Sequence, residues 1–72
     1  MAYNYSKLVG RIIEKFGSQG KFAVAAGMSE RSLSMKLNGH RVFKQPEITK
    51  ACSLLDIADD DIPAYFFTLQ VQ

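Results

Sequence analysis

Cysteine, long apolar runs and targeting signals are scarce or absent in this sequence. Cys52 is the only cysteine among 72 residues, so an internal disulfide is impossible and a cysteine-based metal site is not expected. No segment approaches the length that spans a membrane. Lys7, Arg11 and Lys15 fall where a signal peptide would need an unbroken apolar core. We therefore expect a cytoplasmic protein with no membrane partner.

Residue patterns of catalysis are also missing. His40 is the only histidine, and the sequence contains neither a glycine-rich phosphate loop nor a metal-ligand spacing. The one run of carboxylates, from Asp59 to Asp61, lacks the spaced ligands of a calcium loop. We expect a protein that is not an enzyme, takes no small-molecule substrate and needs no metal or other cofactor.

The length and composition predict one small folded domain over residues 1–72. Apolar residues make up 47% of the chain and charged residues 22%, which is the balance of a globular protein. A chain this short buries a smaller fraction of its surface than a longer one. We therefore expect its stability to be marginal or helped by dimerisation.

Positive and negative charges are distributed unevenly along the chain. All nine Lys and Arg residues lie between Lys7 and Lys50 with only three acids, whereas the remaining residues hold four Asp and no base. A basic portion of this kind fits a surface that faces phosphates, with the acidic end turned away. The alternative is that these charges belong to ordinary solvated helix faces.

Residues 5–16 have the apolar spacing of an amphipathic helix. Asn4 or Ser6 can cap its start, and Gly17 can end it. The apolar positions, which we expect in the core, are Tyr5, Leu8, Val9, Ile12, Ile13 and Phe16.

The central residues 19–39 predict two short helices joined by a tight turn. Gly27 can adopt the left-handed backbone that ends the first helix. The Ser29 hydroxyl can accept a hydrogen bond from a free amide of the second helix, and Asn38 and Gly39 supply its stop.

Apolar and polar residues fall on opposite sides of these two helices. The residues that we expect to be buried are Phe22, Ala23 and Ala26 in the first helix and Leu33 and Leu37 in the second. The outer side of the second helix consists of Glu30, Arg31, Ser34 and Met35. In a helix-turn-helix, this side presents residues to base edges.

A family resemblance rests on this central pattern. The residues that carry it are Ser18, Gln19, Phe22, Ala23, Gly27, Met28, Ser29, Leu33, Ser34, Leu37, Asn38 and Gly39. The pattern resembles the helix-turn-helix of the Cro and cI type of phage repressors, and the opening YSKLVGRIIEKFG and closing YFFTLQVQ resemble small phage-encoded proteins assigned to that superfamily. The resemblance implies a compact all-α, lambda-repressor-like domain of four to five helices, with the helix-turn-helix over about residues 18–39. Lys36 departs from the pattern, which usually has an apolar residue there.

A further helix is predicted to begin near Pro46, after a loop over residues 40–45. Proline suits the first turn of a helix because its missing amide would be unpaired there anyway. The residues that follow on one face are Ile48, Ala51, Cys52 and Leu55. Cys52 is therefore expected to be a buried small hydrophobe and not a reactive thiol.

The C-terminal part predicts a short helix over about residues 60–66 and then an extended tail, in which apolar and polar residues alternate from Thr68 onward. Its apolar residues exceed what one small core needs. We predict that residues of the tail, about 65–72, form the interface of a weak homodimer: Tyr65, Phe66, Phe67, Leu69 and Val71. The alternative is that the aromatic residues fold back under the first helix.

The resemblance also implies which residues would contact double-stranded DNA. Glu30, Arg31 and Met35 stand where repressors contact bases, and their side chains suit a cytosine amine, a guanine and a thymine methyl respectively. The implied phosphate contacts flank that helix: Gln19, Ser29, Asn38, His40, Arg41 and Lys44. For His40, a solvated loop position is the competing interpretation.

Two functions are compatible with the sequence. The first is a sequence-specific DNA-binding transcriptional regulator, a phage Cro/cI-like repressor that inserts its second central helix into the major groove as a homodimer. The alternative is a phage-encoded protein-interaction module on the same fold, which binds for example a host regulator without specific DNA binding. Glu30 and Lys36 favour the alternative. An acid in the first turn of a recognition helix, the helix that contacts the bases, would repel DNA phosphates, and Lys36 breaks the packing of the apolar residue that is usual at its position.

Overall fold

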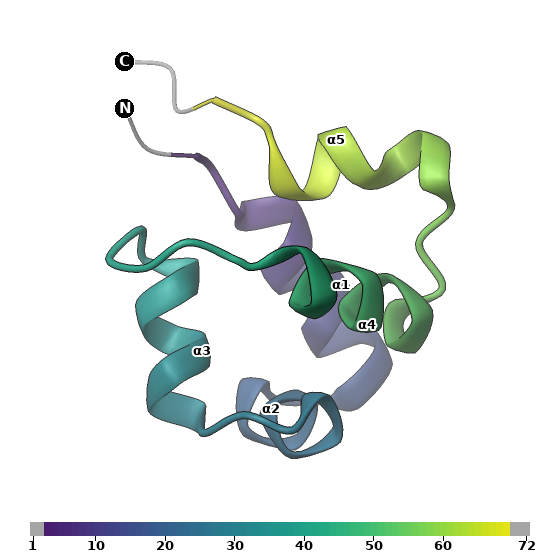
Figure 1. Cartoon of the computed structure of the whole chain (residues 1–72). Helices are drawn as coiled ribbons and strands as arrows, with labels where there is room; N and C mark the ends of the chain where they lie inside the picture. Colours follow the sequence, from purple (N-terminus) through teal and green to yellow (C-terminus); the bar gives the residue numbers. More distant parts are fainter. Residues whose placement is uncertain (1–2, 70–72) are drawn as a thin grey trace.

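Five α-helices and one 3-10 turn form a single bundle in residues 3–69, the part of the chain that this computed structural model describes. The elements are α1 (Ser6–Phe16), α2 (Gln19–Ala26), α3 (Glu30–Leu37), α4 (Gln45–Leu55), η1 (Asp59–Asp61) and α5 (Ile62–Phe66). α2 and the start of α3 lie at one end of the bundle and α5 at the other, with α1 and α4 between them (Figure 1). The all-α fold predicted from the sequence is confirmed.

Serine hydroxyls and glycines set the boundaries of α2 and α3. The hydroxyls of Ser18 and Ser29 accept hydrogen bonds from the backbone N–H groups of Lys21 and Ser32, at 3.1 and 3.0 Å. Gly27 ends α2 in the left-handed conformation, with φ +75°, which glycine adopts without steric cost. The predicted turn between the two central helices is therefore confirmed.

Side-chain acceptors also start α1 and α4. The Asn4 carboxamide oxygen accepts the N–H of Ser6 at 2.8 Å. At α4, a Glu47 carboxylate oxygen accepts the N–H of Lys44 at 2.8 Å, and Pro46 occupies the first turn. Each acceptor pairs an amide that the helix itself leaves without a partner.

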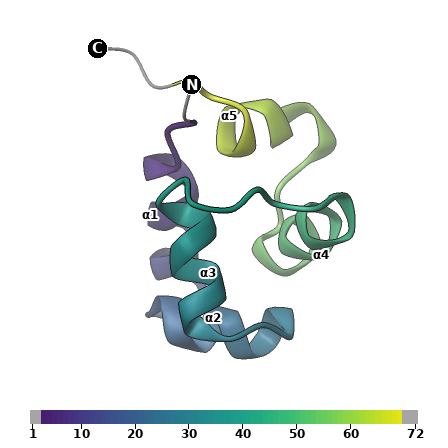
Figure 2. The same ribbon diagram turned by 60° about the vertical axis from the view of Figure 1, so that its left-hand side comes forward.

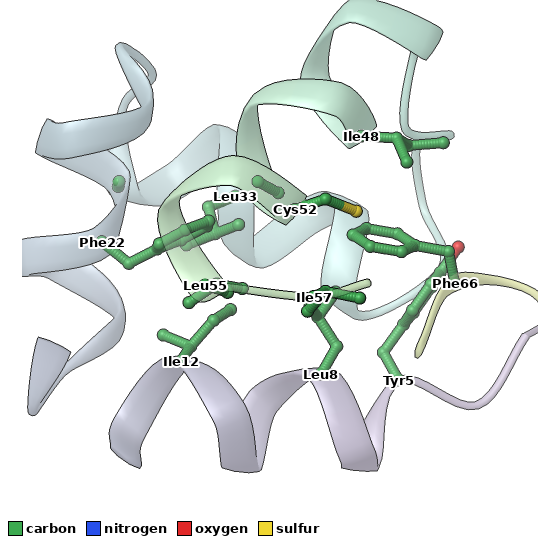
Figure 3. Packing of buried hydrophobic residues seen from close by; sticks show 12 residues of the cluster. Tyr5, Leu8, Ile12, Phe22, Leu33, Ile48, Cys52, Leu55, Ile57 and Phe66 are labelled. Carbon is green, nitrogen blue, oxygen red and sulfur yellow. The ribbon is translucent and has the colours of Figure 1, made fainter. Parts of the chain in front are cut away.

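Every α-helix contributes to one hydrophobic core (Figure 3). The largest fully buried side chains are Phe22, Phe66, Leu8, Ile12, Leu33 and Leu55. Helices of five to eleven residues are marginal in isolation, so this shared burial is what holds them in place. The four α4 residues expected on one face, Ile48, Ala51, Cys52 and Leu55, are all buried.

Two expectations about α1 and the C-terminal helix need correction. Ile13 was expected in the core, yet it is 46% exposed. Leu8 and Ile12, four residues apart, take the inward side of α1, and Ile13 lies further round the helix, where the neighbouring elements leave it half uncovered. The helix expected over residues 60–66 is divided, because Asp59–Asp61 form the 3-10 turn and α5 begins only at Ile62.

The two ends of the described chain meet beside α5. Tyr3 and Leu69 form an antiparallel bridge, and the N–H of Asn4 donates to the carbonyl of Thr68 at 2.6 Å. The extended conformation expected after Thr68 therefore occurs at Leu69, while Val71 lies outside the described residues. None of the helices in residues 3–69 is long and apolar enough to cross a membrane.

Candidate interaction surface

The outer side of α2 adjoins the first turn of α3. Gly20 and Val24 lie four residues apart in α2 and therefore on the same side of it. The Glu30 carboxylate of α3 lies against this side, since a Cβ placed on Gly20 would be 3.2 Å from its Oε1 atom. Gly20 thus leaves room for Glu30, and Val24 stands one turn further along α2 with 81% of its surface exposed.

The same surface continues along α3 into the following loop. Arg31 and Met35 lie four residues apart on the outer side of α3. The carbonyl of Met35 accepts the N–H groups of His40 and Arg41 at 2.8 and 3.3 Å, so the loop folds back over the end of the helix (Figure 2). Val42 follows and is 76% exposed. We call this region the α2–α3 surface; it consists of Gly20, Val24, Glu30, Arg31, Met35, Arg41 and Val42.

The structure brings the three predicted base-contact residues together on this surface. Glu30 and Arg31 are exposed in the first turn of α3, and Met35 is half-buried one turn later. Val24 and Val42 were not singled out from the sequence. Their exposure depends on how α2 and the loop pack, which apolar spacing alone does not show.

The predicted phosphate-contact residues divide into two groups. Ser29 and Asn38 have local roles: the Ser29 hydroxyl caps α3, and the Asn38 side-chain amide donates to the carbonyl and hydroxyl of Ser34 at 2.9 and 3.2 Å. The side chains of the other predicted phosphate contacts make no hydrogen bond within the described residues. Gln19 is half-buried at the start of α2, and the exposed residues after α3 are His40, Arg41 and Lys44.

Lys36, the departure from the helix-turn-helix pattern, is buried between α3 and α4. It is 5% exposed, and its Nζ lies 3.5 Å from an Oε atom of Glu47. The other Glu47 oxygen caps α4. An ion pair therefore replaces the apolar contact that the pattern usually has, and Glu47 in the first turn of α4 was the sequence signal for it.

The basic side chains of α1 contact acidic or aromatic groups, whereas those near the α2–α3 surface make no ion pair. Arg11 pairs with Glu14, and Lys15 pairs with Asp56, each at 3.0 Å. Lys7 lies 4.8 Å from the ring centre of Tyr65. Within residues 3–69, six cations make no ion pair: Lys7, Lys21, Arg31, Arg41, Lys44 and Lys50. Apart from Lys7, the cations without an ion pair thus lie on α2, α3, the loop and α4.

The residues predicted for a dimer interface are divided between the core and the surface. Phe66 is 1% exposed and belongs to the chain's own core, whereas Phe67 and Leu69 are 47% and 52% exposed. Tyr65 is half-buried beneath Lys7. The alternative of aromatic residues folding back on α1 therefore describes Phe66, and the dimer itself stays a prediction.

Beside these residues lies an open groove of about 490 Å³ between the start of α1 and the end of α3. Its lining is Tyr3, Asn4, Tyr5, Ser6, Val9, Leu37 and Asn38. Tyr3 and Phe67 pack edge to face, with ring centres 5.7 Å apart. Burial, and after it the neighbouring Tyr3, raises the pKa of the Tyr5 hydroxyl. This hydroxyl is therefore neutral at physiological pH.

The fold and this surface define a class of protein: a small all-α domain in which two short helices, α2 and α3, are joined by a tight turn. Among residues 3–69, no three His, Cys, Asp or Glu side chains are placed to hold a metal ion. The chain belongs to the family described as "Protein of unknown function (DUF739)", which matches residues 1–69.

One solved structure supports a narrower comparison. The chain is similar to the modulator of repression (MOR) of the temperate bacteriophage TP901-1 from Lactococcus lactis, whose solution structure matches with a TM-score of 0.82. The two sequences are 49% identical, over 100% of this chain and 97% of that chain. No curated protein matches. The relative is a phage protein, as the sequence analysis predicts for this chain, whereas membership of the Cro and cI superfamily stays a prediction.

Proposed function

We propose that this chain is a phage-encoded regulator that modulates repression by binding a repressor protein. The observation that carries the proposal is its 49% identity, over its whole length, to a protein named a modulator of repression. At such identity over the full length, the two proteins share the fold. The function is thus the protein-interaction alternative of the sequence analysis, with a phage repressor as the partner.

The outer side of α3 supports a protein partner. Glu30 is exposed in the first turn, where a carboxylate would repel DNA phosphates. Ser29 and Asn38, two of the predicted phosphate contacts, already make hydrogen bonds that hold the ends of α3. These features reduce the number of groups that α3 can offer to DNA.

Isothermal titration calorimetry tests the proposal directly. The chain is titrated into the purified repressor of the phage that encodes it, with the repressor of an unrelated phage as control. We expect saturable binding at a fixed stoichiometry, with a Kd of about 1 μM or tighter, to the first repressor alone. Adding the chain should also change the gel shift that the repressor gives with its operator. Absence of binding to the cognate repressor would overturn the proposal.

Sequence-specific DNA binding is the second candidate, because Arg31 is exposed on α3 and is one of the six cations without an ion pair in residues 3–69. In this case, Arg31→Ala should cost about 1–3 kcal/mol on the specific site and leave binding to random DNA largely unchanged.

Arg41→Ala or Lys44→Ala should weaken binding to all sequences, and each substitution that removes a phosphate interaction should lower the salt slope by about one. Gel shifts at about 50 and 200 mM salt measure both effects, and no shift at the lower salt removes this candidate.

A further inference from the structure

We infer that the α2–α3 surface is the docking site for the repressor, and that the segment of the repressor seated there is acidic and apolar. This inference rests on the proposed function and adds to it the surface and the chemistry of the partner.

The apolar part of the argument is the exposure of two valines. Val24 and Val42 are 81% and 76% exposed, the highest values among the large hydrophobic residues that stand exposed in residues 3–69. Neither side chain contributes to the core. Covering them would therefore stabilise a complex at no cost to the fold of the chain.

Contacts between elements connect α2, α3 and the loop, which carry these valines. Val24 shares its side of α2 with Gly20, against which the carboxylate of Glu30 lies. Arg31 follows Glu30 in α3, and Met35 follows Arg31 by one turn. The Met35 carbonyl binds the loop N–H groups that precede Val42. In Figures 1 and 2, α3 accordingly lies between α2 and the loop on one side of the molecule.

Charge complementarity identifies the partner segment as acidic. The unpaired cations on or beside this surface, within residues 3–69, are Lys21, Arg31, Arg41 and Lys44. The acids Asp59, Asp60 and Asp61 lie in η1, which packs against α5, and α5 lies at the opposite end of the bundle from α2 (Figure 1). An acidic segment can therefore approach these cations without meeting a comparable group of carboxylates. Glu30 is the one acid on the surface, and a peptide, unlike the continuously charged DNA backbone, can place an uncharged residue opposite it.

The combination of valines and cations distinguishes a protein segment from DNA. The DNA backbone would occupy the cations but gives the Val24 side chain on α2 nothing apolar to contact, because apolar readout of DNA occurs at base edges in the groove. A peptide that carries both carboxylates and aliphatic side chains satisfies both kinds of group. Apolar anchors surrounded by charged residues are typical of protein interfaces.

The test compares two double variants and one single variant in the calorimetric titration with the cognate repressor. The Val24→Gln/Val42→Gln variant removes the apolar contacts without changing the charge, and we expect its Kd to rise about tenfold or more. The Arg31→Gln/Arg41→Gln variant should also bind more weakly and with a smaller salt dependence. Ile13→Gln, a change at a 46% exposed residue of α1, is the matched control, with an expected change within about twofold.

Each outcome decides between specific alternatives. If the unaltered chain binds the repressor and the valine variant binds equally well, the docking site is wrong while the proposed function stands. Tighter binding by the arginine variant would show that the partner segment is basic. If only duplex DNA binds, and the valine variant binds it as the unaltered chain does, the surface is a nucleic-acid site and the inference fails. No binding by the unaltered chain overturns the proposed function and this inference together. Circular dichroism of each variant confirms that the helices are retained.

Discussion

Lys36 and Glu47 form an ion pair in which the lysine is buried and the glutamate is partly buried. Lys36 occupies a place where an apolar side chain is usual, and Glu47 both neutralises it and caps α4. Burying a lone charge is costly, so each partner depends on the other. The pair also links α3, the second helix of the predicted helix-turn-helix, to α4. The position of α3 therefore depends on an ion pair.

Loss of Glu47 should be more damaging than loss of Lys36. Glu47→Ala removes the cap and leaves a buried ammonium without a partner, so we expect the free energy of unfolding to fall by about 3 kcal/mol. Lys36→Met restores an apolar contact and should change stability by less than about 1 kcal/mol, or increase it. Urea unfolding followed by circular dichroism measures both. Equal losses in the two variants would contradict this account.

The thiol of Cys52 should be inert while the protein is folded. Burial, and after it the charge of Asp59, raises the pKa of this thiol, and the side chain is buried in the core. Both effects reduce the thiolate, which is the nucleophile, at any given pH. Labelling by a thiol reagent at a pH of about 8 should be slow in buffer and fast in concentrated urea. Rapid labelling of the folded protein would show that the helices around Cys52 open frequently.

At the level of elements, α5 is a five-residue helix with one fully buried side chain, and Ile62 and Tyr65 pack partly buried against the core. Phe66 is fully buried and packs edge to face against Phe43, with ring centres 5.3 Å apart. Phe67, the next residue, is 47% exposed. Two adjacent aromatic residues thus have different roles, because a helix turns them to different sides.

A pair of alanine variants separates these roles. Phe66→Ala should lower the free energy of unfolding by about 3–5 kcal/mol, which is a large share of the stability of a small domain. Phe67→Ala should cost less than about 1 kcal/mol, since it removes mainly an exposed contact with Tyr3. Thermal unfolding of both variants provides the comparison. A similar decrease in both would mean that α5 docks through more than Phe66.

For the whole molecule, the arrangement of charge separates two surfaces. Five of the six cations without an ion pair in residues 3–69 lie on α2, α3, the loop and α4, whereas Lys7 and the exposed apolar residues Tyr3, Phe67 and Leu69 lie beside α5. A dimer formed through the second surface would leave the α2–α3 surface open. The four Asp residues after Leu55 would repel one another across a close contact, so such a dimer is expected to be weak.

The predicted dimer is best tested by point changes. Removing the last seven residues would also remove Phe66 from the core, so unfolding would obscure the result. We expect sedimentation equilibrium of the unaltered chain to give a monomer–dimer equilibrium near micromolar concentration, and Phe67→Gln/Leu69→Gln to shift it to monomer. A monomer at every concentration for both proteins would remove the dimer.

Much of the fold could be predicted because helix signals are local. Ser29 as a cap, Gly27 as a terminator and the buried face of α4 depend on neighbours within a few residues. The predicted exposure of Glu30 and Arg31 is likewise observed, because their position on α3 follows from helical spacing alone. The burial of Ile13 was predicted wrongly, because it depends on distant segments. Apolar spacing shows which side of a helix is apolar, but not how much of that side the neighbouring helices cover.

The amino-acid sequence by itself determined where most of the helices can begin and end, the turn at Gly27 and the uneven distribution of charge, since these depend on backbone preferences and on residue order. Only the tertiary structure decided which charges stay unpaired, because Lys15 and Asp56 are 41 residues apart in sequence and meet only through folding. It also decided that Lys36 is buried and that Val24 and Val42 stay exposed. Exposure depends on which helices cover a residue, and that coverage is a property of packing between distant segments.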